Sequence, residues 1–341
     1  MKNNIFKIWW NSLIYAPNDP KFKAGGKIKI AAIGGGTGLS TLLRGLKEYS
    51  SDISAVVTVT DDGSSSGEIR KDFDILPPGD IRKCISALAY DEDLISNLME
   101  YRFGERGSRF SGHTLGNIWI TALAKYLGSF EKAVQATTEI FNTAGKILPA
   151  TLNDVNIAAL YDDGKKVVGE SKIAKAGKHI VEIQLDRKNV RANPQVVKAL
   201  LDADLIILGP GSLYTSLVPN LLIPGIRNAI CQNKKAVKIY IVNCSTEKGE
   251  TEHYSVADHV DVIQKYSKKS FEYCVVNSRI MKKSSNQTEL GEINNITLKK
   301  GEDTQMNVVT ADVINEKNAL FHDSSKLAKN VIKIYNKVRQ R

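Results

Sequence analysis

The sequence lacks the features that mark secreted, zinc-binding and membrane proteins. Only four of its 341 residues are cysteines, and none are spaced as in a zinc motif or a disulfide framework. The longest apolar runs fall far short of a membrane span. We therefore expect a protein of a reducing compartment with no stable membrane insertion.

Residues 1–26 differ in character from the rest of the chain. A short basic and aromatic segment ends at Trp9 and Trp10, and Pro17, Pro20 and a glycine pair then interrupt the chain. We expect no signal peptide, because the segment has neither a long unbroken apolar stretch nor a small-residue cleavage site. The alternatives are an arm packed on the domain, which we favour, and a weak interfacial anchor that uses the two tryptophans.

The formal net charge of +10 does not indicate a nucleic-acid site. Lysines dominate, many of them near the C-terminal end, and no basic run is interleaved with aromatic residues. We expect no nucleic-acid partner. The charge would favour small anionic molecules.

Alternating apolar strands and amphipathic helices predict an α/β fold with a mostly parallel, doubly wound sheet. Strands are expected at 27–33, 53–59, 204–208, 236–242 and 272–276, and helices at 39–49, 81–90, 114–127, 129–142, 195–202, 254–266 and 324–337. The pattern changes at about 146–190, where an Asp-Gly turn and short strands predict a small β-rich insertion. We therefore expect one domain over 27–341, with a polar surface excursion at 279–306.

The stretch at 30–38 is the most informative, because an apolar run leads directly into glycines. Strand, glycine turn and helix start in this order expose backbone N–H groups where a phosphate can bind. The third glycine of a dinucleotide fingerprint is absent, which disfavours an NAD(P) oxidoreductase. We expect an anion site here, with a ligand-free tight turn as the alternative. The candidate binding residues are Gly34, Gly35, Gly36, Thr37 and Gly38.

The second expected strand ends in an acidic, serine-rich loop. Asp61 or Asp62 could accept hydrogen bonds from a ribose, or the pair could hold Mg²⁺. Ser64 and Ser65 supply donors for the same anion. An ordinary acidic turn is the alternative.

Two later strands end in polar loops as well. The first loop offers glycines, hydroxyl groups and a tyrosine that could stack on a base, although a simple Gly-Pro-Gly turn would look the same. Its candidate binding residues are Gly209, Gly211, Ser212, Tyr214 and Thr215. We interpret the second loop, 243–246, as a plain polar loop.

Two further candidates lie at expected helix starts. Asp80 is interpreted first as an N-cap, and otherwise as a carboxylate directed into the cleft. His113 and Asn117, four residues apart, share one helix face, so Asn117 is a binding candidate and His113 joins Asp61 and Asp62 as a catalytic candidate. Capping or packing is the commoner role of a lone histidine. Nothing marks a nucleophile.

Together these segments resemble the gluconeogenesis factor family (YvcK), which shares a superfamily with the 2-phospho-L-lactate transferases. The resemblance rests on the residues around 33–40, 61–63, 75–82, 112–117 and 208–216, and it is extended by 249–251, 257–260 and 322–323. It covers roughly residues 28–340 in the same order.

The resemblance implies a Rossmann-like three-layer α/β/α fold, a cytoplasmic location and a role in cell shape during gluconeogenic growth. It also implies binding of a UDP-sugar such as UDP-N-acetylglucosamine, for regulation. The alternative is a transferase that moves a phospholactate-type group from a guanosine diphospho donor, with Mg²⁺ at Asp61 and Asp62. The ligand could be another nucleotide diphosphate, and a homo-oligomer is among the open alternatives.

This chain departs from the family pattern at two positions. Ser64 stands where the family usually has the second glycine of the acidic loop, and Phe321 stands where an arginine usually precedes His322-Asp323. An arginine there could clamp a diphosphate with its fork of donors, which phenylalanine cannot do. Residues 279–300 also show little similarity to the family.

Overall fold

The computed structural model describes residues 28–104, 107–280 and 294–340. The N-terminal arm expected at 1–26, and the central part of the surface excursion expected at 279–306, lie outside these ranges.

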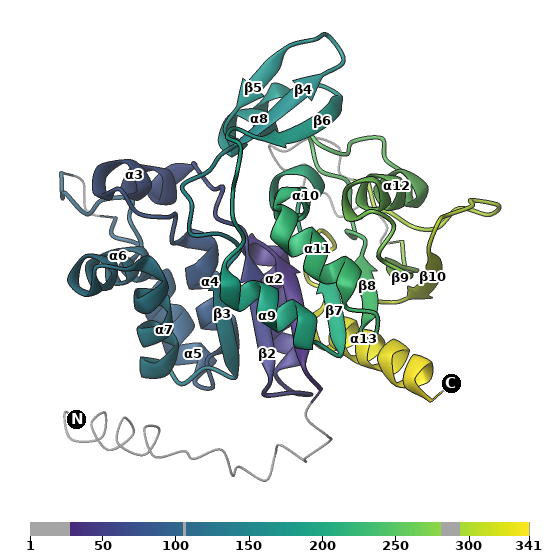
Figure 1. The fold of residues 1–341 in the computed structure, drawn as a ribbon, viewed down its shortest axis with the longest axis horizontal. Helices are drawn as coiled ribbons and strands as arrows, with labels where there is room; N and C mark the ends of the chain where they lie inside the picture. Colours follow the sequence, from purple (N-terminus) through teal and green to yellow (C-terminus); the bar gives the residue numbers. More distant parts are fainter. Residues whose placement is uncertain (1–27, 105–106, 281–293, 341) are drawn as a thin grey trace.

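A seven-stranded parallel sheet forms the centre of the molecule (Figure 1). Its order is β10-β9-β8-β7-β1-β2-β3. All five expected strands are confirmed, and their buried, β-branched residues explain why the apolar pattern revealed them. The strands are β1 (Ile30–Gly34), β2 (Ile53–Val57), β3 (Gly145–Pro149), β7 (Leu205–Leu208), β8 (Val237–Ile241), β9 (Tyr273–Asn277) and β10 (Asn307–Ala311).

The two outermost strands were not predicted from the sequence. β3 begins with a glycine and ends with a proline, and β10 carries polar residues at its exposed positions. β3 pairs with β2 in the main sheet, with Ile53 opposite Gly145. The boundary expected at 146 is therefore corrected: the insertion starts after Pro149.

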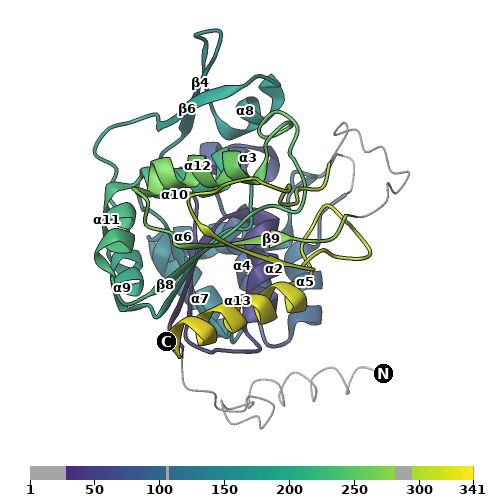
Figure 2. The same ribbon diagram turned by 90° about the vertical axis from the view of Figure 1, so that its right-hand side faces the viewer.

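Helices cover both faces of the sheet and produce three layers (Figures 1 and 2). Each face has its own hydrophobic core. One face carries α9 (Pro194–Asp202), α10 (Val218–Leu222), α11 (Pro224–Gln232) and α12 (Val256–Ser267). The other carries α2 (Gly36–Leu46), α4 (Gly79–Leu88), α7 (Phe130–Ile140) and α13 (Ser324–Arg339).

The seven expected helices are present, with ends shifted by a few residues, but others were not predicted. α6 (Leu115–Leu127) matches an expected helix, whereas α3 (Ser64–Phe73), α5 (Glu92–Glu100) and the one-turn π-helix η1 (Leu213–Leu217) do not. The serines after the acidic turn therefore begin a helix instead of continuing a loop. Polar residues conceal α3, because only Ser65, Ser66 and Ile69 are buried.

The insertion is an antiparallel sheet above the carboxyl edge of the main sheet (Figure 1). It consists of β4 (Ile157–Tyr161), β5 (Lys166–Val168), α8 (Glu170–Ala176) and β6 (Ile180–Leu185), which includes the expected hairpin. Hydrogen bonds fix it to the main domain: Arg70 Nη1 donates to Asn156 Oδ1 at 2.9 Å, and Ile183 N donates to the Tyr266 hydroxyl at 3.0 Å.

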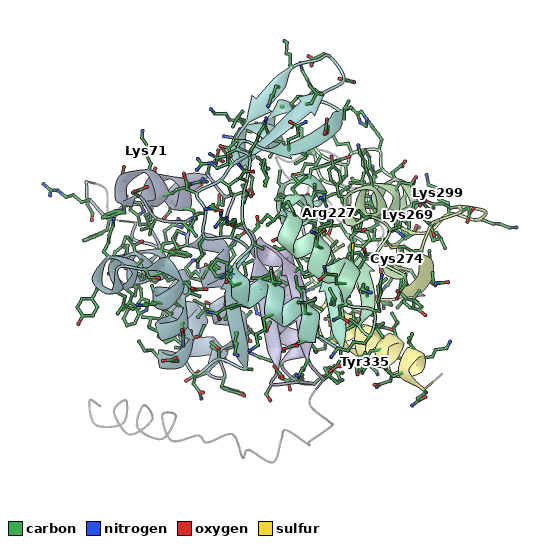
Figure 3. All side chains as sticks on the ribbon, viewed as in Figure 1. Lys71, Arg227, Lys269, Cys274, Lys299 and Tyr335 are labelled. Carbon is green, nitrogen blue, oxygen red and sulfur yellow. The ribbon has the colours of Figure 1, made fainter. Side chains whose placement is uncertain are left out.

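Basic side chains are spread over the surface. Lys71 extends from α3 on one side of the molecule, whereas Lys269 and Lys299 extend near α12 on the other (Figure 3). Within the described ranges, no helix combines the length and the apolar character that crossing a bilayer requires.

The strand order places a crevice between β1 and β7. From β1 the chain proceeds outward through β2 and β3, and then returns to β7 on the other side of β1. At such a reversal the connections after the two strands leave on opposite faces, so ligands bind beyond the carboxyl ends of the strands. The four polar loops singled out from the sequence follow β8, β7, β1 and β2, which are neighbours in the sheet.

Candidate functional site

The loops after β1 and β7 meet directly at this crevice. A Cβ on Gly38 would lie 2.5 Å from the Pro210 carbonyl oxygen, so only glycine allows the two loops to approach this closely. Gly36 has a φ of +63°, which also favours glycine. These two glycines bring the first turn of α2 against the loop after β7.

A cavity of about 500 Å³ opens where the loops meet. All four polar loops contribute to its wall, together with α8 of the insertion and the segment before α13. The described lining residues are Gly35, Gly36, Thr37, Gly38, Thr41, Asp61, Asp80, Lys83, Glu170, Ala174, Pro210, Gly211, Ser212, Ser216, Asn243, Cys244, Ser245, Thr246, Glu247, Lys248, Glu250, Leu320, Phe321 and His322. The volume is in the range of small-molecule sites.

One wall of the cavity is the amino-terminal end of α2. The N-cap is Gly35, which has no side chain to cap the helix, and the backbone N–H of Gly36 in the first turn donates to the Asp80 carboxylate. The first N–H groups of an 11-residue helix carry a partial positive charge. This wall can therefore stabilise an anion, and the anion site expected from the sequence stays a prediction.

Three carboxylates from different elements gather near this wall. Burial raises the pKa of Asp80. The charge of Asp61 adds to this increase, and that of Lys83 opposes it. Burial also raises the pKa of Glu170 well above its usual value, and the charges of Asp80 and Asp61 add to the effect. Asp61 therefore lies close enough to disfavour ionisation of Asp80, and both disfavour ionisation of Glu170.

The N-cap interpretation of Asp80 is wrong. Helix α4 begins at Gly79 with Pro78 as its N-cap, so Asp80 occupies the first turn. Its carboxylate lies beside the glycine turn and accepts a hydrogen bond from the backbone of Gly36. It is directed into the cavity, which was the second interpretation.

Asp61 and Asp62, although adjacent, point to different places. Asp61 lines the cavity, and its Oδ1 accepts the Gly63 N–H at 2.9 Å. Asp62 turns to the insertion, where its Oδ1 accepts the Ser171 N–H at 2.8 Å. Asp62 thus holds the first turn of α8, the helix that brings Glu170 to the cavity.

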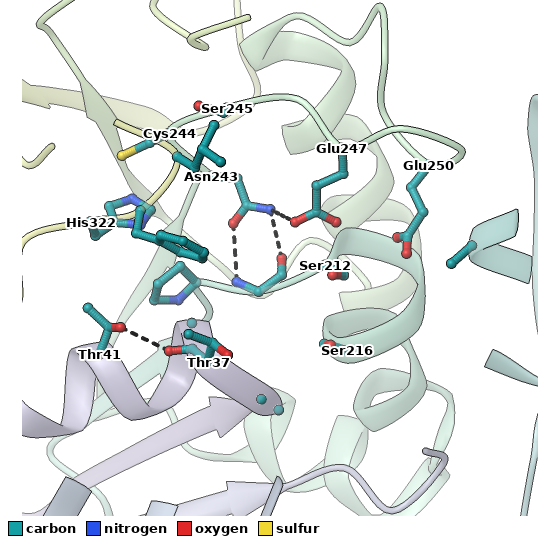
Figure 4. A pocket seen from close by; sticks show the side chains of 18 of the residues that line it. Thr37, Thr41, Ser212, Ser216, Asn243, Cys244, Ser245, Glu247, Glu250 and His322 are labelled. Carbon is teal, nitrogen blue, oxygen red and sulfur yellow. Dashed lines mark hydrogen bonds between the residues drawn. The ribbon is translucent and has the colours of Figure 1, made fainter. Parts of the chain in front are cut away.

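The loop after β8 is part of the site, contrary to its interpretation as a plain polar loop. Asn243 makes two hydrogen bonds with the backbone of Gly211: its Oδ1 accepts the N–H at 3.1 Å, and its Nδ2 donates to the carbonyl at 3.0 Å. The same Nδ2 donates to Glu247 Oε1 at 2.9 Å (Figure 4). Burial and the neighbouring Glu250 raise the pKa of Glu247 to about 8.

Glu250 fixes the start of η1. Its carboxylate accepts the Tyr214 N–H at 3.0 Å and the Thr215 hydroxyl at 2.7 Å. The Tyr214 hydroxyl bonds to that of Tyr254 at 2.8 Å, and its ring lines a separate, smaller cavity beside α12. Tyr214 is therefore not placed to stack on a molecule in the larger cavity.

His113 lies outside the cavity wall, in a polar network between helices. Its Nδ1 is 3.0 Å from the Ser65 hydroxyl, which also accepts a hydrogen bond from Asn117 Nδ2 at 3.0 Å. Arg82 of α4 in turn donates from Nε to Asn117 Oδ1 at 3.1 Å. The network joins α3, α4 and α6 behind the acidic turn, so these residues support the turn.

Cations are fewer than carboxylates in the cavity wall. The described lining contains Lys83 and Lys248 against five carboxylates. Phe321, at 41% exposure, occupies the position where the family resemblance leads one to expect arginine. Beside it, burial lowers the pKa of His322 to about 4.

About half of the site residues expected from the sequence reach the cavity. The lining includes Gly35, Gly36, Thr37, Gly38, Asp61, Asp80, Gly211 and Ser212, and does not include Gly34, Asp62, Ser64, Ser65, His113, Asn117, Gly209, Tyr214 or Thr215. Glu170 and Glu247 were missed. Glu170 lies in the insertion, far along the chain from every other cavity segment, and no local motif surrounds it.

The strand order and the glycine turn at its reversal point define a Rossmann-like α/β protein. The family described as 2-phospho-L-lactate transferase CofD matches residues 30–314. A solved structure of a protein from Bacillus halodurans is 35% identical with a TM-score of 0.85, covering 90% of this chain and all of that one.

Curated relatives of the chain identify one family within this superfamily. The gluconeogenesis factor of Bacillus subtilis is 45% identical over 71% of this chain and 76% of its own length. A provisionally named gluconeogenesis factor of Nostoc sp. is 52% identical over 69% of this chain, but the match spans 51% of that relative's length. The chain belongs to the gluconeogenesis factor (YvcK) family within the CofD-like superfamily.

Proposed function

We propose that this chain is a cytoplasmic gluconeogenesis factor that binds a nucleotide sugar of the UDP-N-acetylglucosamine type and regulates cell shape during gluconeogenic growth. The observation that carries the binding proposal is the composition of the cavity. One wall presents helix N–H groups, and others present carboxylates that can accept hydrogen bonds. A diphosphate suits the first kind of group, and sugar and ribose hydroxyls suit the second.

In this proposal, Lys83 and Lys248 of the cavity wall bind the diphosphate. Lys83 Nζ lies 3.5 Å from Asp80 Oδ1 and is 34% exposed, so its long side chain can turn towards a bound anion. Removing this charge should weaken the binding of diphosphates more than that of an uncharged nucleoside.

Calorimetry with a ligand panel tests the proposal. Purified protein is titrated with UDP-N-acetylglucosamine, UDP-glucose, UDP, uridine and GDP, each with and without Mg²⁺. We expect binding of at least one UDP-sugar, weakened roughly tenfold by Lys83→Ala, while Lys71→Ala on the outer surface of α3 leaves it unchanged. Absence of heat with every UDP-sugar would reject the proposal.

A 2-phospho-L-lactate transferase-like activity is the second candidate, favoured by the carboxylates of Asp61, Asp80 and Glu170 beside the α2 wall. Among the residues that the structure describes, no three histidine, cysteine, aspartate or glutamate side chains are grouped so that they could hold a metal ion by themselves. The oxygen donors nevertheless fit Mg²⁺, which needs only one or two carboxylates when substrate phosphates complete its coordination. When bound, the ion would neutralise diphosphate charge.

In this candidate the protein acts mainly by positioning. Asp61 and Asp80 would hold the ion, the first turn of α2 would orient the diphosphate, and Glu170 with its raised pKa could hold a proton at its carboxyl group. Incubation with a guanosine diphospho-lactate donor, a deazaflavin precursor and Mg²⁺ tests it. Product that disappears in Asp61→Asn would support transfer, and no product in the wild type would reject it.

A further inference from the structure

Helix α5 carries an exposed apolar ridge. Its buried side packs Met99 and Ile95 against the core, whereas Leu94, Leu98 and Tyr101 are 44%, 40% and 50% exposed. Their spacing of four and three residues places them on one face of the helix. We call these three residues the α5 ridge.

An aromatic cluster extends the ridge beyond the end of the helix. The ring of Tyr101 meets that of Phe103 edge-on at 5.2 Å between centroids, and Phe103 meets Phe110 at 5.6 Å. Phe110 is itself 53% exposed. A group of exposed apolar side chains of this kind commonly marks an interaction site.

The start of α5 lies close to the point where the described chain begins. The segment 47–50, just after α2, contacts both places: Ser50 Oγ donates to the Ile28 carbonyl at 2.7 Å, and Lys47 Nζ donates to the Ala89 carbonyl at 3.0 Å and to Glu92 at 2.6 Å. Segment 47–50 therefore connects the first described residues to the start of α5.

The preceding sequence has the composition that the ridge needs. Residues 5–10 contain Ile5, Phe6, Ile8, Trp9 and Trp10, and residues 1–18 include lysines at 2 and 7 without any acidic residue. Helix α5 and its N-cap carry Asp91, Glu92, Asp93 and Glu100 and no basic residue. Glu92 already pairs with Arg44 and Lys47, and Glu100 pairs with Arg82, so Asp91 and Asp93 are the acidic residues of α5 and its N-cap that suit the basic segment. The ridge and the segment are thus matched in apolar character and opposite in charge.

We propose that residues 5–10 of this same chain dock on the α5 ridge, with Trp9 and Trp10 as its apolar anchors. The reach is sufficient, since the 17 residues from 11 to 27 span up to roughly 60 Å when extended. Attachment to the same molecule also gives the segment a high effective concentration at the ridge, so intramolecular docking is favoured over association of two copies.

Site-specific photo-crosslinking of the full chain tests this inference. The photoreactive residue p-benzoylphenylalanine replaces Leu98, and a matched control carries it at Tyr126 of α6, which is 86% exposed. We expect the Leu98 probe to join peptides from residues 1–27 within the monomer, roughly tenfold more often than the Tyr126 probe does. The double variant Trp9→Ser/Trp10→Ser should abolish this preference, because it removes two large apolar contacts.

Three results would overturn the inference. Crosslinks confined to dimers would assign the ridge to a second copy of the chain. Equal yields of arm peptides from the two probe positions would show that docking is not specific. Absence of a Leu98 crosslink to the arm, with tryptophan-dependent sedimentation of the protein on phosphatidylglycerol vesicles, would assign Trp9 and Trp10 to a membrane surface.

Discussion

Asn243 holds Gly211 by both of its backbone groups, with bonds of 3.1 and 3.0 Å from a single amide side chain. The arrangement replaces the pairing that a neighbouring strand would give, at a point where β7 and β8 have already ended. It keeps the loop after β7 in place against the first turn of α2. The shape of the cavity therefore depends on one residue of the loop after β8.

Replacing Asn243 should damage both stability and binding. Asn243→Ala leaves the Gly211 N–H and carbonyl without their partner and removes a donor to Glu247, at an expected cost of about 1–3 kcal/mol in the free energy of unfolding. Urea denaturation measures the cost. Asn330→Ala is the control, because its side chain donates to the Lys326 carbonyl of its own helix and connects no two loops of the described chain. Equal stability of the two variants would contradict the role of the Asn243 bonds.

A methyl group on Gly38 should separate the two loops of the crevice. Gly38→Ala places a Cβ within 2.5 Å of the Pro210 oxygen, so backbone must move and UDP-sugar affinity should fall at least tenfold in calorimetry. Gly104→Ala is the matched control, since its Cβ would meet nothing within 4 Å. Retained affinity in Gly38→Ala would mean that the crevice does not bind the ligand.

Asp61 and Asp62 should have separable roles. Asp62→Ala removes the acceptor of the Ser171 N–H, so amide hydrogen exchange in α8 should accelerate. Asp61→Ala should leave exchange in α8 unchanged and alter ligand affinity directly. Hydrogen exchange followed by mass spectrometry, paired with calorimetry, distinguishes the two. Identical behaviour of the variants would argue against the divided roles.

Ser64 should limit stability through its backbone. Its φ of +43° is costly for a residue with a Cβ, and its side chain is exposed. Ser64→Gly relieves roughly 1 kcal/mol of this strain, partly offset by the greater freedom of glycine in the unfolded chain. Thermal unfolding should therefore show a small gain. Ser64→Ala keeps the strain and should match the wild type; a gain of the same size in Ser64→Ala would refute this explanation.

Glu247 should make stability fall as the pH rises. Its pKa is about 8 in the folded chain against 4.5 as the ordinary value, so the folded state binds more protons across this interval. The stabilisation is complete below about pH 4.5 and is lost as the pH rises through about 8.

The clearest window for this test is pH 6.5–8. Burial lowers the pKa of His322 from 6.5 to about 4, so His322 makes stability rise with pH between these two values, opposite to Glu247. Above about pH 6.5, His322 no longer contributes to the pH dependence of stability. Glu247→Gln cannot ionise, and melting temperatures measured between pH 6.5 and 8 should depend less on pH than in the wild type. An unchanged slope would contradict the raised pKa.

The central fold was accessible from the sequence because its strands are buried on both faces. The buried strand β7 has an uninterrupted apolar signature, whereas β3 and β10 at the sheet edges are only partly buried and carry polar residues. Helix α3 was hidden for the same reason, since much of its surface faces solvent. Local patterns report burial, so elements at the margin leave little trace.

The site was accessible where a local rule ties a residue to a turn. Gly36 and Gly38 are such residues, because conformation and close approach demand glycine. Glu170 and Asn243 are different: each acts on a segment distant in the sequence, through contacts that only the folded chain creates. The opposite happened with Tyr214, whose ring was expected near a ligand and instead turns towards Tyr254.

The cavity wall contains residues from Gly35 to His322, taken from both ends of the described chain and from the insertion between them. No fragment that lacks one of these parts can form the whole wall. A molecule that contacts the whole wall therefore binds only the globally folded chain, and its binding raises the free energy of complete unfolding. Cellular abundance of the protein would then follow the concentration of its ligand, since the unliganded chain spends more time open to proteolysis.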